Sequence, residues 1–279
     1  YRHLIKICNI YMFRPRVIPI LLLKKSGLVK SIKFKDYQYI GDPINAVKIF
    51  NDLFADELVF LDITATQENR CIPIEFVKSV GDEANMAFAV GGGIKSLFDI
   101  NNIINAGSEK IIINSEAINN SNLISDAAKE FGSSTIVVSI DVKKRLFKGQ
   151  QVYINGGSKS TGIAPLLYAK MMEENGAGEI LVNSIDLDGM MTGYDIKLIE
   201  SISKEVKVPV IASGGAGTFE DFKRVVIEGH ASAVAAGSMF VYHGPRKAVL
   251  LSYPSVGELN LLSYENLNRH QSPSSRSLF

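Results

Sequence analysis

Two glycine-rich segments, 122 residues apart, limit the possible folds of this chain more than any other feature. The first is Val90-Gly91-Gly92-Gly93-Ile94 and the second is Ala212-Ser213-Gly214-Gly215-Ala216-Gly217. Each follows a short apolar run, at 86–89 and 208–211, so each is expected at the C-terminal end of a strand. Glycine lets the backbone approach an anion closely and offer its N–H groups. One such segment is more often a tight turn, whereas two with matching neighbours predict a duplicated half-domain with a phosphate site in each half.

The sequence around the glycines repeats as well. Residues 57–62 match 179–184, residues 110–115 match 232–238, and residues 16–22 match 135–141. Together with the two runs before the glycines, these pairs predict eight strands, at 16–23, 57–63, 86–90, 110–114, 135–141, 179–185, 208–213 and 232–236. Their nearly continuous apolar composition is typical of parallel strands that helices cover.

Amphipathic stretches at helical spacing lie between these strands. Four of them carry apolar residues three or four positions apart: Ile44, Val47, Phe50 and Leu53; Leu97, Ile100, Ile103 and Ile104; Ala169 and Met172; Phe222, Val225 and Val226. This alternation predicts an α/β fold, a (β/α)8 TIM barrel built from two duplicated half-barrels. In that fold the site lies on the loops after the strands, where both glycine segments, Asp62, Asp141 and Asp186 fall. Asp62 is equally compatible with a helix N-cap.

Composition excludes several classes of function. The chain has 279 residues, 46% of them hydrophobic, and a formal net charge of +1, so it is not expected to bind nucleic acid or a membrane. Cys8 and Cys71 have no metal-site spacing, and two thiols fit a reducing cytoplasm. The four histidines are scattered, which argues against a histidine-based triad. No metal and no cofactor is predicted.

The ends of the chain differ from its middle. Residues 1–13 are predicted to be a non-native or disordered extension, with Met12 as the natural start and no good signal peptide before it. Residues 14–262 are predicted to form one barrel. Residues 263–279 end in a Ser-rich polar run and are predicted to be a flexible tail.

Several long motifs resemble the HisF family, the cyclase subunit of imidazole glycerol phosphate synthase. They lie at 57–65, 90–94, 176–180, 184–189 and 212–217, within a similarity over roughly residues 14–250. The resemblance implies a TIM barrel that docks a HisH-type glutaminase and receives ammonia from it. The ammonia would cross the barrel and react with a ribulosyl-formimino nucleotide carrying two phosphates. The products would be imidazole glycerol phosphate, used in histidine biosynthesis, and aminoimidazole carboxamide ribotide.

Two sets of site residues follow from this resemblance. Phosphate and substrate contacts are expected at Lys30, Gly92, Gly93, Asn114, Ser115, Asp188, Gly189, Gly214, Gly215, Gly237 and Ser238. An ammonia gate at the opposite end is expected from Arg16, Glu57, Lys110 and Glu179. A charged layer there could serve stability alone, but retention of all four residue types favours the gate. The lysines at 24, 25, 30, 33 and 35 are expected on the loop after the first strand, where they would attract a phosphorylated ligand.

One catalytic position departs from the family pattern. The family uses two aspartates for acid–base chemistry, and Asp141 supplies the second. Leu22 occupies the first position, and residues 17–35 contain no acid that could replace it. Losing a general acid or base lowers the rate by about 10²–10⁴-fold, so the sequence predicts inefficient cyclase turnover.

The departure has a counterpart in the WbuZ-type HisF paralogues. The segments 16–30, 41–50 and 242–250 resemble these proteins, which are associated with a HisH-like glutaminase and a sugar amidotransferase of surface-polysaccharide (O-antigen) biosynthesis. The first hypothesis is therefore an ammonia channel for acetamidino-sugar formation. The histidine-pathway cyclase is the alternative, followed by the related isomerase and by a non-catalytic scaffold that binds a regulatory phosphate ligand.

Overall fold

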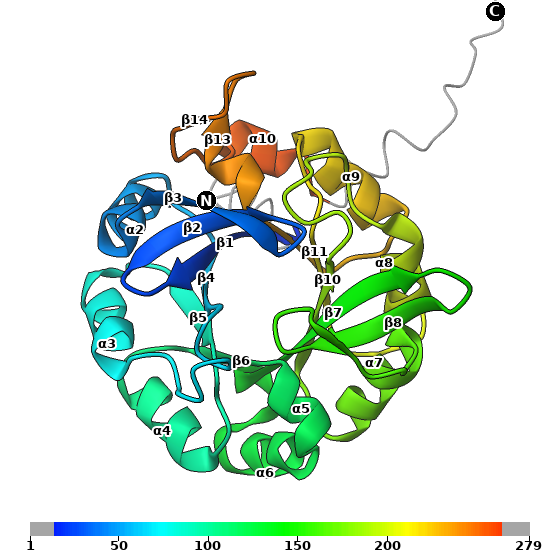
Figure 1. Ribbon diagram of the computed structural model, residues 1–279. Helices are drawn as coiled ribbons and strands as arrows, with labels where there is room; N and C mark the ends of the chain where they lie inside the picture. Colours follow the sequence, from blue (N-terminus) through cyan, green and yellow to red (C-terminus); the bar gives the residue numbers. More distant parts are fainter. Residues whose placement is uncertain (1–13, 264–279) are drawn as a thin grey trace, which may run out of the picture.

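The structure, a computed structural model, describes residues 14–263, which form a closed barrel of parallel strands inside a ring of helices (Figure 1). Eight strands make the wall: β1 (Arg16–Lys24), β4 (Glu57–Asp62), β5 (Ala87–Gly91), β6 (Lys110–Ile113), β7 (Ile136–Arg145), β10 (Glu179–Ser184), β11 (Val210–Ser213) and β12 (Ala233–Ala236). Each strand pairs in parallel with the next, and β12 closes the barrel on β1. The predicted TIM barrel is confirmed.

The helices follow the strands and cover the outside of the barrel. They are α2 (Pro43–Asp52), α3 (Ile74–Glu83), α4 (Leu97–Asn105), α5 (Ser115–Asn119), α6 (Asn122–Phe131), α7 (Pro165–Glu174), α8 (Ile196–Ser203), α9 (Phe219–Ile227) and α10 (Val256–Asn260). Local sequence fixes where several begin. Asp42 accepts a hydrogen bond from the N–H of Asn45, 2.8 Å away, and Pro43 supplies the first helical residue of α2.

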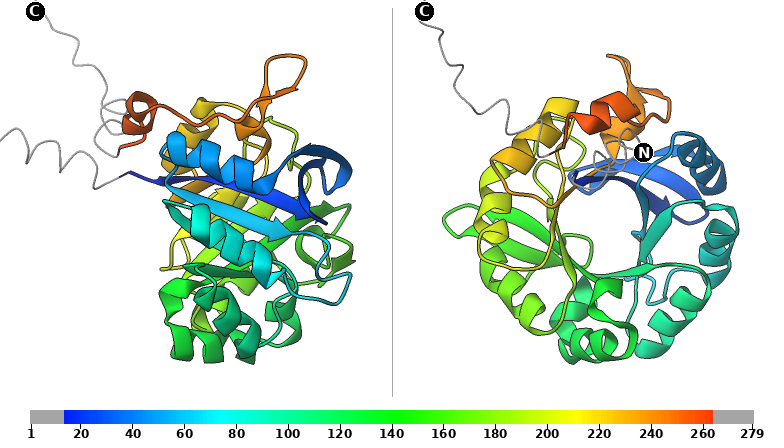
Figure 2. Two further views of the ribbon diagram at one scale, coloured as in Figure 1. Left: turned by 90° about the vertical axis from the view of Figure 1, so that its left-hand side faces the viewer. Right: turned by 180° about the vertical axis from the view of Figure 1, so that it is seen from behind.

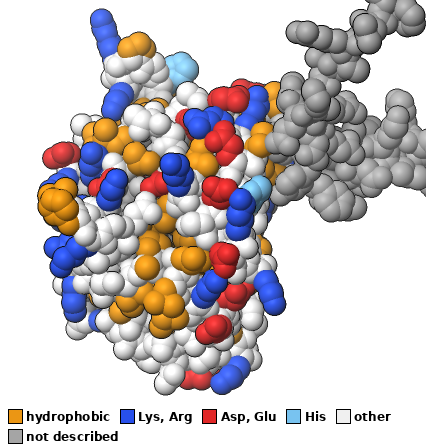
Figure 3. All heavy atoms as spheres, turned by 90° about the vertical axis from the view of Figure 1, so that its right-hand side faces the viewer, with side chains coloured by type: hydrophobic (Ala, Val, Ile, Leu, Met, Phe, Trp, Pro, Cys, Tyr) orange, Lys and Arg blue, Asp and Glu red, His pale blue; other side chains and the backbone are white. Residues whose placement is uncertain are grey.

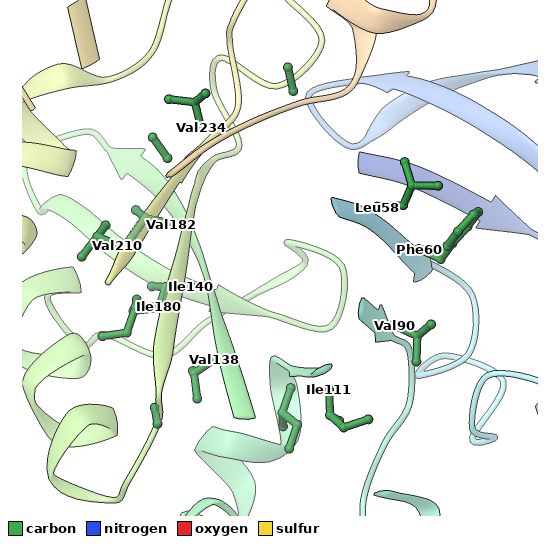
Figure 4. Packing of buried hydrophobic residues seen from close by; sticks show 14 of the residues in the cluster. Leu58, Phe60, Val90, Ile111, Val138, Ile140, Ile180, Val182, Val210 and Val234 are labelled. Carbon is green, nitrogen blue, oxygen red and sulfur yellow. The ribbon is translucent and has the colours of Figure 1, made fainter. Parts of the chain in front are cut away.

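Apolar side chains fill two separate layers. The outer layer lies between strands and helices and includes Phe60 and Ile140, which Figure 4 shows among the packed side chains of neighbouring strands. The inner layer fills the barrel itself and consists of Ile18, Ile20, Val59, Ala89, Ile112, Val137, Leu181, Ile211, Ala233 and Ala235. The alternation of side chains along each strand produces these two layers.

The segment after β1 corrects one expectation. The predicted lysine-bearing loop is an antiparallel hairpin, β2 (Gly27–Ile32) and β3 (Lys35–Gly41), whose first strand pairs with β1. Strand β7 likewise continues into an antiparallel hairpin with β8 (Gly149–Ile154), which pairs with the short β9 (Lys159–Ser160). The first strand of each half-barrel therefore carries the same extension, as duplication predicts.

The remaining elements follow β12 in the chain. The short strands β13 (Tyr242–His243) and β14 (Ala248–Val249) form a small hairpin before α10. In Figure 2 the barrel strands run side by side across the molecule in the side view. No helix within residues 14–263 is long and apolar enough to cross a membrane. The predictions for the extension at 1–13 and the tail lie outside the described residues, except that Ser263 donates its N–H to the carbonyl of Asn260.

Candidate functional site

A cavity of about 340 Å³ opens at the C-terminal ends of the barrel strands. Residues from all eight strands contribute to its wall, together with part of β2. The cavity brings together Asp141 and every residue that the resemblance assigned to substrate: Lys30, Gly92, Gly93, Asn114, Ser115, Asp188, Gly189, Gly214, Gly215, Gly237 and Ser238. Residues far apart in the sequence therefore share one concave site, which is the usual place for a TIM-barrel ligand.

The two glycine segments adopt backbone conformations that other residues rarely tolerate. Gly93 has a φ of +64°, and a Cβ there would lie 1.8 Å from the carbonyl oxygen of Arg70. Gly215 has a φ of +115°, and a Cβ there would lie 2.1 Å from the carbonyl oxygen of Gly193. Both positions thus require glycine for space as well as for conformation.

These turns leave backbone donors at the cavity wall without a partner in the described part of the chain. Among residues 14–263, no hydrogen bond uses the N–H of Gly93, Ile94, Gly215 or Ala216. All four residues line the cavity. The two pairs are separated by 122 positions, so each half-barrel presents an equivalent pair of N–H groups, the arrangement that favours an anion.

The helices that follow the two glycine turns, α4 and α9, begin with matching capping boxes. The Asp99 carboxylate accepts from the N–H groups of Lys95 and Ser96, both 3.0 Å away, at the start of α4. The Asp221 carboxylate accepts from the N–H groups of Gly217 and Thr218, at 3.0 and 2.8 Å, at the start of α9. The two aspartates are 122 residues apart, and each occupies the third position of its helix in a capping box.

Asp141 lines the cavity between two amide side chains. Its carboxylate accepts from Asn114 Nδ2 at 3.1 Å and from Asn183 Nδ2 at 3.2 Å. Burial raises the pKa of Asp141 to about 7; the hydrogen bond from Asn183 opposes this rise, and the charge of Asp188 adds to it. A carboxyl group with this pKa exchanges a proton readily at neutral pH, which suits general acid–base chemistry.

Asn183 is a site residue that the sequence reasoning missed. It lies on β10, two residues beyond Leu181 of the inner layer and opposite Asp141 of β7. Its Oδ1 is buried and has no hydrogen-bond partner among the described residues, and a Cβ on Gly214 would lie 2.5 Å from this atom. The two-residue period of a strand, counted from Glu179, could have identified it as an inward-facing residue.

Lys30 and Asp188 form a charged part of the wall beneath the β2–β3 hairpin. Lys30 is buried and donates from Nζ to the carbonyl of Ile20, and burial lowers its pKa to about 8 although the charge of Asp188 opposes this. Asp188 accepts from Ser31 Oγ at 3.2 Å. Gly237 lies against Lys30, since a Cβ there would be 2.4 Å from Nζ. The amine is therefore held inside the pocket wall, on strand β2 of the hairpin rather than on the predicted loop.

Leu22 lies on β1, where its neighbour on β4 is Leu61, and both line the cavity. Asp62, the acid next along β4, accepts from Arg70 Nη1 at 2.6 Å and from the N–H groups of Thr64 and Ala65. These bonds hold the loop after β4, and Asp62 is not the helix N-cap of the alternative expectation, because the next helix, α3, begins only at Ile74. The position facing into the cavity from β1 carries no proton donor.

A ring of four charged side chains occupies the opposite end of the barrel. Arg16, Glu57, Lys110 and Glu179 are the first residues of β1, β4, β6 and β10. Arg16 pairs with Glu57 and, at 2.7 Å, with Glu179. Lys110 Nζ lies 3.1 Å from Glu57 and 3.2 Å from Glu179, which completes the alternating ring. The two carboxylates are almost buried, with side-chain exposures of 3% and 11%.

Comparison with known proteins agrees with this geometry. The model of the family described as histidine biosynthesis protein matches residues 16–245. A Pseudomonas aeruginosa protein, provisionally named imidazole glycerol phosphate synthase subunit hisF2, is 46% identical over 250 residues, covering 90% of this chain and 100% of that protein. The Alkaliphilus metalliredigens imidazole glycerol phosphate synthase subunit HisF is 43% identical over 232 residues, covering 83% of this chain and 92% of that protein. A Vibrio vulnificus protein provisionally named hisF3 is 41% identical over 248 residues, covering 88% and 95%.

Proposed function

This chain belongs to the histidine biosynthesis protein family and is similar over most of its length to HisF subunits of imidazole glycerol phosphate synthase, and on that premise we propose that it conducts ammonia through its barrel. The observation that carries the proposal is an axial sequence of three layers. The charged ring lies at one end of the strands, the apolar inner layer follows it, and the polar cavity lies at the other end.

The middle layer supports transport of neutral ammonia rather than ammonium. It consists of aliphatic side chains that offer no hydrogen-bond partner. An ion entering this layer would lose its hydration without compensation, which is far more costly than burying a small neutral molecule. The ring below it carries two positive and two negative side chains, so ammonia meets a closed but formally neutral layer before it enters the barrel.

The cavity supports a role other than efficient cyclisation. Asp141 is present with a pKa near neutrality, but Leu22 stands where the family has its other catalytic aspartate. With one acid–base group in place of two, turnover is expected to be about 10²–10⁴-fold lower than that of a two-aspartate cyclase. Ammonia that reaches the cavity would then leave it for another acceptor.

We propose two partners on this basis. A HisH-type glutaminase would bind at the charged ring and release ammonia there, and a sugar amidotransferase would take the nitrogen at the cavity. The resemblance of residues 16–30 and 242–250 to WbuZ-type paralogues supports surface-polysaccharide biosynthesis as the pathway. The names hisF2 and hisF3 of two relatives also denote paralogues of HisF.

A cyclase of histidine biosynthesis is the second candidate, and one observation favours it. Both half-barrels keep an equivalent pair of unpaired N–H groups at the cavity, as a ligand with two phosphates requires. An ammonia channel alone has no need of two phosphate sites.

Isotope labelling tests the proposed route. The chain is combined with a HisH-type glutaminase and the amidotransferase, and amide-¹⁵N glutamine is supplied in the presence of excess unlabelled ammonium. Transport through the barrel predicts a product that carries mainly ¹⁵N. A product whose label equals that of the bulk ammonium would overturn the proposal, because the nitrogen would then have passed through solvent.

The gate can be tested in the same assay. Lys110→Met removes one cation from the ring and is expected to dilute the label, whereas Lys110→Arg keeps the charge and serves as the matched control. Equal ¹⁵N labelling of the product by both variants would show that the charged ring does not control the passage of ammonia.

A further inference from the structure

Two hairpins flank the opening of the cavity and form a surface that the proposed function has not used. We name this surface the mouth rim and define it as residues 24–41, around β2 and β3, and residues 143–160, around β7, β8 and β9. Figure 1 shows the two hairpins on different sides of the central opening. They extend from β1 and β7, the first strands of the two half-barrels.

The mouth rim concentrates positive charge. Apart from Lys30, which is buried in the cavity wall, its nine cationic residues are Lys24, Lys25, Lys33, Lys35, Lys143, Lys144, Arg145, Lys148 and Lys159, against the single acid Asp36. The formal net charge of the whole chain is only +1, so the rest of the chain carries an excess of acids. In Figure 3 blue side chains gather along the left edge, while the remainder of that face mixes both signs. A charge imbalance of this kind steers an acidic partner to one face.

The same surface exposes large apolar side chains. Phe147 is 96% exposed and Leu146 is 82% exposed at the turn between β7 and β8, and Tyr39 of β3 is 70% exposed. Phe147 also has a φ of +61°, an uncommon conformation for an aromatic residue. Aromatic and arginine side chains of this type are the usual anchors of protein interfaces.

A cation–π contact holds each hairpin internally, and one hydrogen bond ties the β7–β8 hairpin to the loop after β10. Lys24 Nζ lies 4.2 Å from the centre of the Tyr37 ring, and Lys143 Nζ lies 5.8 Å from the centre of the Tyr153 ring. The backbone N–H of Lys144 donates to Asp186 at 2.8 Å. A hairpin held in this way presents its tip with little loss of conformational entropy on binding.

A small phosphorylated ligand does not account for the tip of the β7–β8 hairpin. None of residues 143–148 lines the cavity, although Lys30, Phe34 and Tyr37 of the other hairpin do. The cations and the apolar pair at 144–148 therefore lie outside the volume that a ligand in the cavity would fill. Their combination matches a larger partner that covers the opening.

We propose that the mouth rim docks an acidic protein face with an apolar socket, on the enzyme that receives nitrogen from the barrel. The inference rests on the proposed function, because only a channel that ends at another enzyme needs its opening covered. Leu146 and Phe147 would fill the socket, and Lys144, Arg145 and Lys148 would pair with carboxylates around it.

Binding of the purified sugar amidotransferase to the full chain tests the docking directly. The charge variant Lys144→Glu/Lys148→Glu and the apolar variant Leu146→Ser/Phe147→Ser are compared with Lys78→Glu/Lys129→Glu, which makes the same charge change on the exposed faces of α3 and α6. Both rim variants are expected to weaken binding at least about tenfold, and wild-type affinity is expected to fall as salt rises. The control variant should bind as wild type does, and circular dichroism checks that all variants are folded.

Three outcomes would overturn the docking proposal. In the first, the wild-type protein does not bind the amidotransferase. In the second, the rim variants and the control variant weaken binding to the amidotransferase equally. In the third, the rim variants weaken binding to vesicles of phosphatidylglycerol and phosphatidylcholine but not to the amidotransferase. The ¹⁵N label reports separately on transport. If the amidotransferase binds through the mouth rim but the product carries no ¹⁵N label, the ammonia route is wrong and the docking surface stands. If a rim variant binds the amidotransferase with wild-type affinity and still transfers the label, the docking surface is wrong and the ammonia route stands.

Discussion

Replacing Asp141 with Asn gives a prediction whose size follows from the structure. The pKa of this buried carboxyl is raised from 3.8 to about 7 in the folded chain. Between these two values the unfolded chain has lost the proton and the folded chain keeps it. The free energy of unfolding therefore falls as pH rises through this window, by about 1.36 kcal/mol per pH unit and about 4 kcal/mol in all.

Asp141→Asn removes this pH dependence, because an amide does not titrate. The substitution also places an amide between the amides of Asn114 and Asn183, which costs hydrogen bonds but adds only a constant. The informative quantity is therefore the difference in free energy of unfolding between variant and wild type as a function of pH. This difference is expected to shift in favour of the variant by about 2 kcal/mol between pH 5 and 7, because the dependence on pH weakens as pH approaches the folded pKa of about 7.

Urea unfolding of both proteins at several pH values from 5 to 8 measures this difference. Asp126→Asn on the exposed surface of α6 controls for the loss of one carboxylate. A difference curve for Asp141→Asn that changes by less than about 1 kcal/mol over this range would refute the argument, since the carboxyl could not then be protonated in the folded chain at neutral pH.

Two further changes test the ring and the glycine turns. Lys110→Met is expected to lower the free energy of unfolding by about 3 kcal/mol, because it leaves two nearly buried carboxylates with one cation; Lys204→Met, in an exposed pair at 2.6 Å, should cost less than about 0.5 kcal/mol in the same urea titration. Gly215→Ala is expected to lower the melting temperature and to abolish binding of inorganic phosphate by calorimetry, because its Cβ would meet Gly193. Gly244→Ala, also at positive φ but with no atom within 4 Å, should retain phosphate binding; equal effects of the two glycine changes would contradict the steric explanation.

The barrel could be predicted from the sequence because its strands are short apolar runs that repeat at a nearly fixed offset. Every predicted strand lies within two residues of the observed start. The β2–β3 hairpin was missed because its turn residues, Lys33 and Phe34, have positive φ values of 53° and 61° without the usual Asn-Gly sequence. Tertiary contacts hold this turn: the N–H of Lys33 donates to the carbonyl of Asp188, and Phe34 lies against Gly157.

The sequence located residues of the candidate cavity where motifs are long, and it did so less well where a single side chain decides. The glycine segments and Asp141 carry recognisable neighbours, and the structure gathers them in one cavity. Asn183 has no motif of its own, and its importance depends on facing Asp141 across two paired strands. Asn183 and Asp141 are 42 positions apart in the sequence, and they face each other only because β7 and β10 pair in the closed barrel. Local sequence does not reveal this pairing.

The most direct test of the central claim is ammonium-dependent turnover of the ribulosyl-formimino nucleotide by the folded wild-type chain, at saturating ammonium so that no glutaminase is needed. The account predicts turnover near background, because Leu22 cannot transfer a proton, and a rise of about 10²-fold or more in the Leu22→Asp variant if the rest of the cavity is competent. Wild-type turnover equal to that of a two-aspartate cyclase, with little gain in Leu22→Asp, would contradict the account and make this chain a histidine-pathway cyclase.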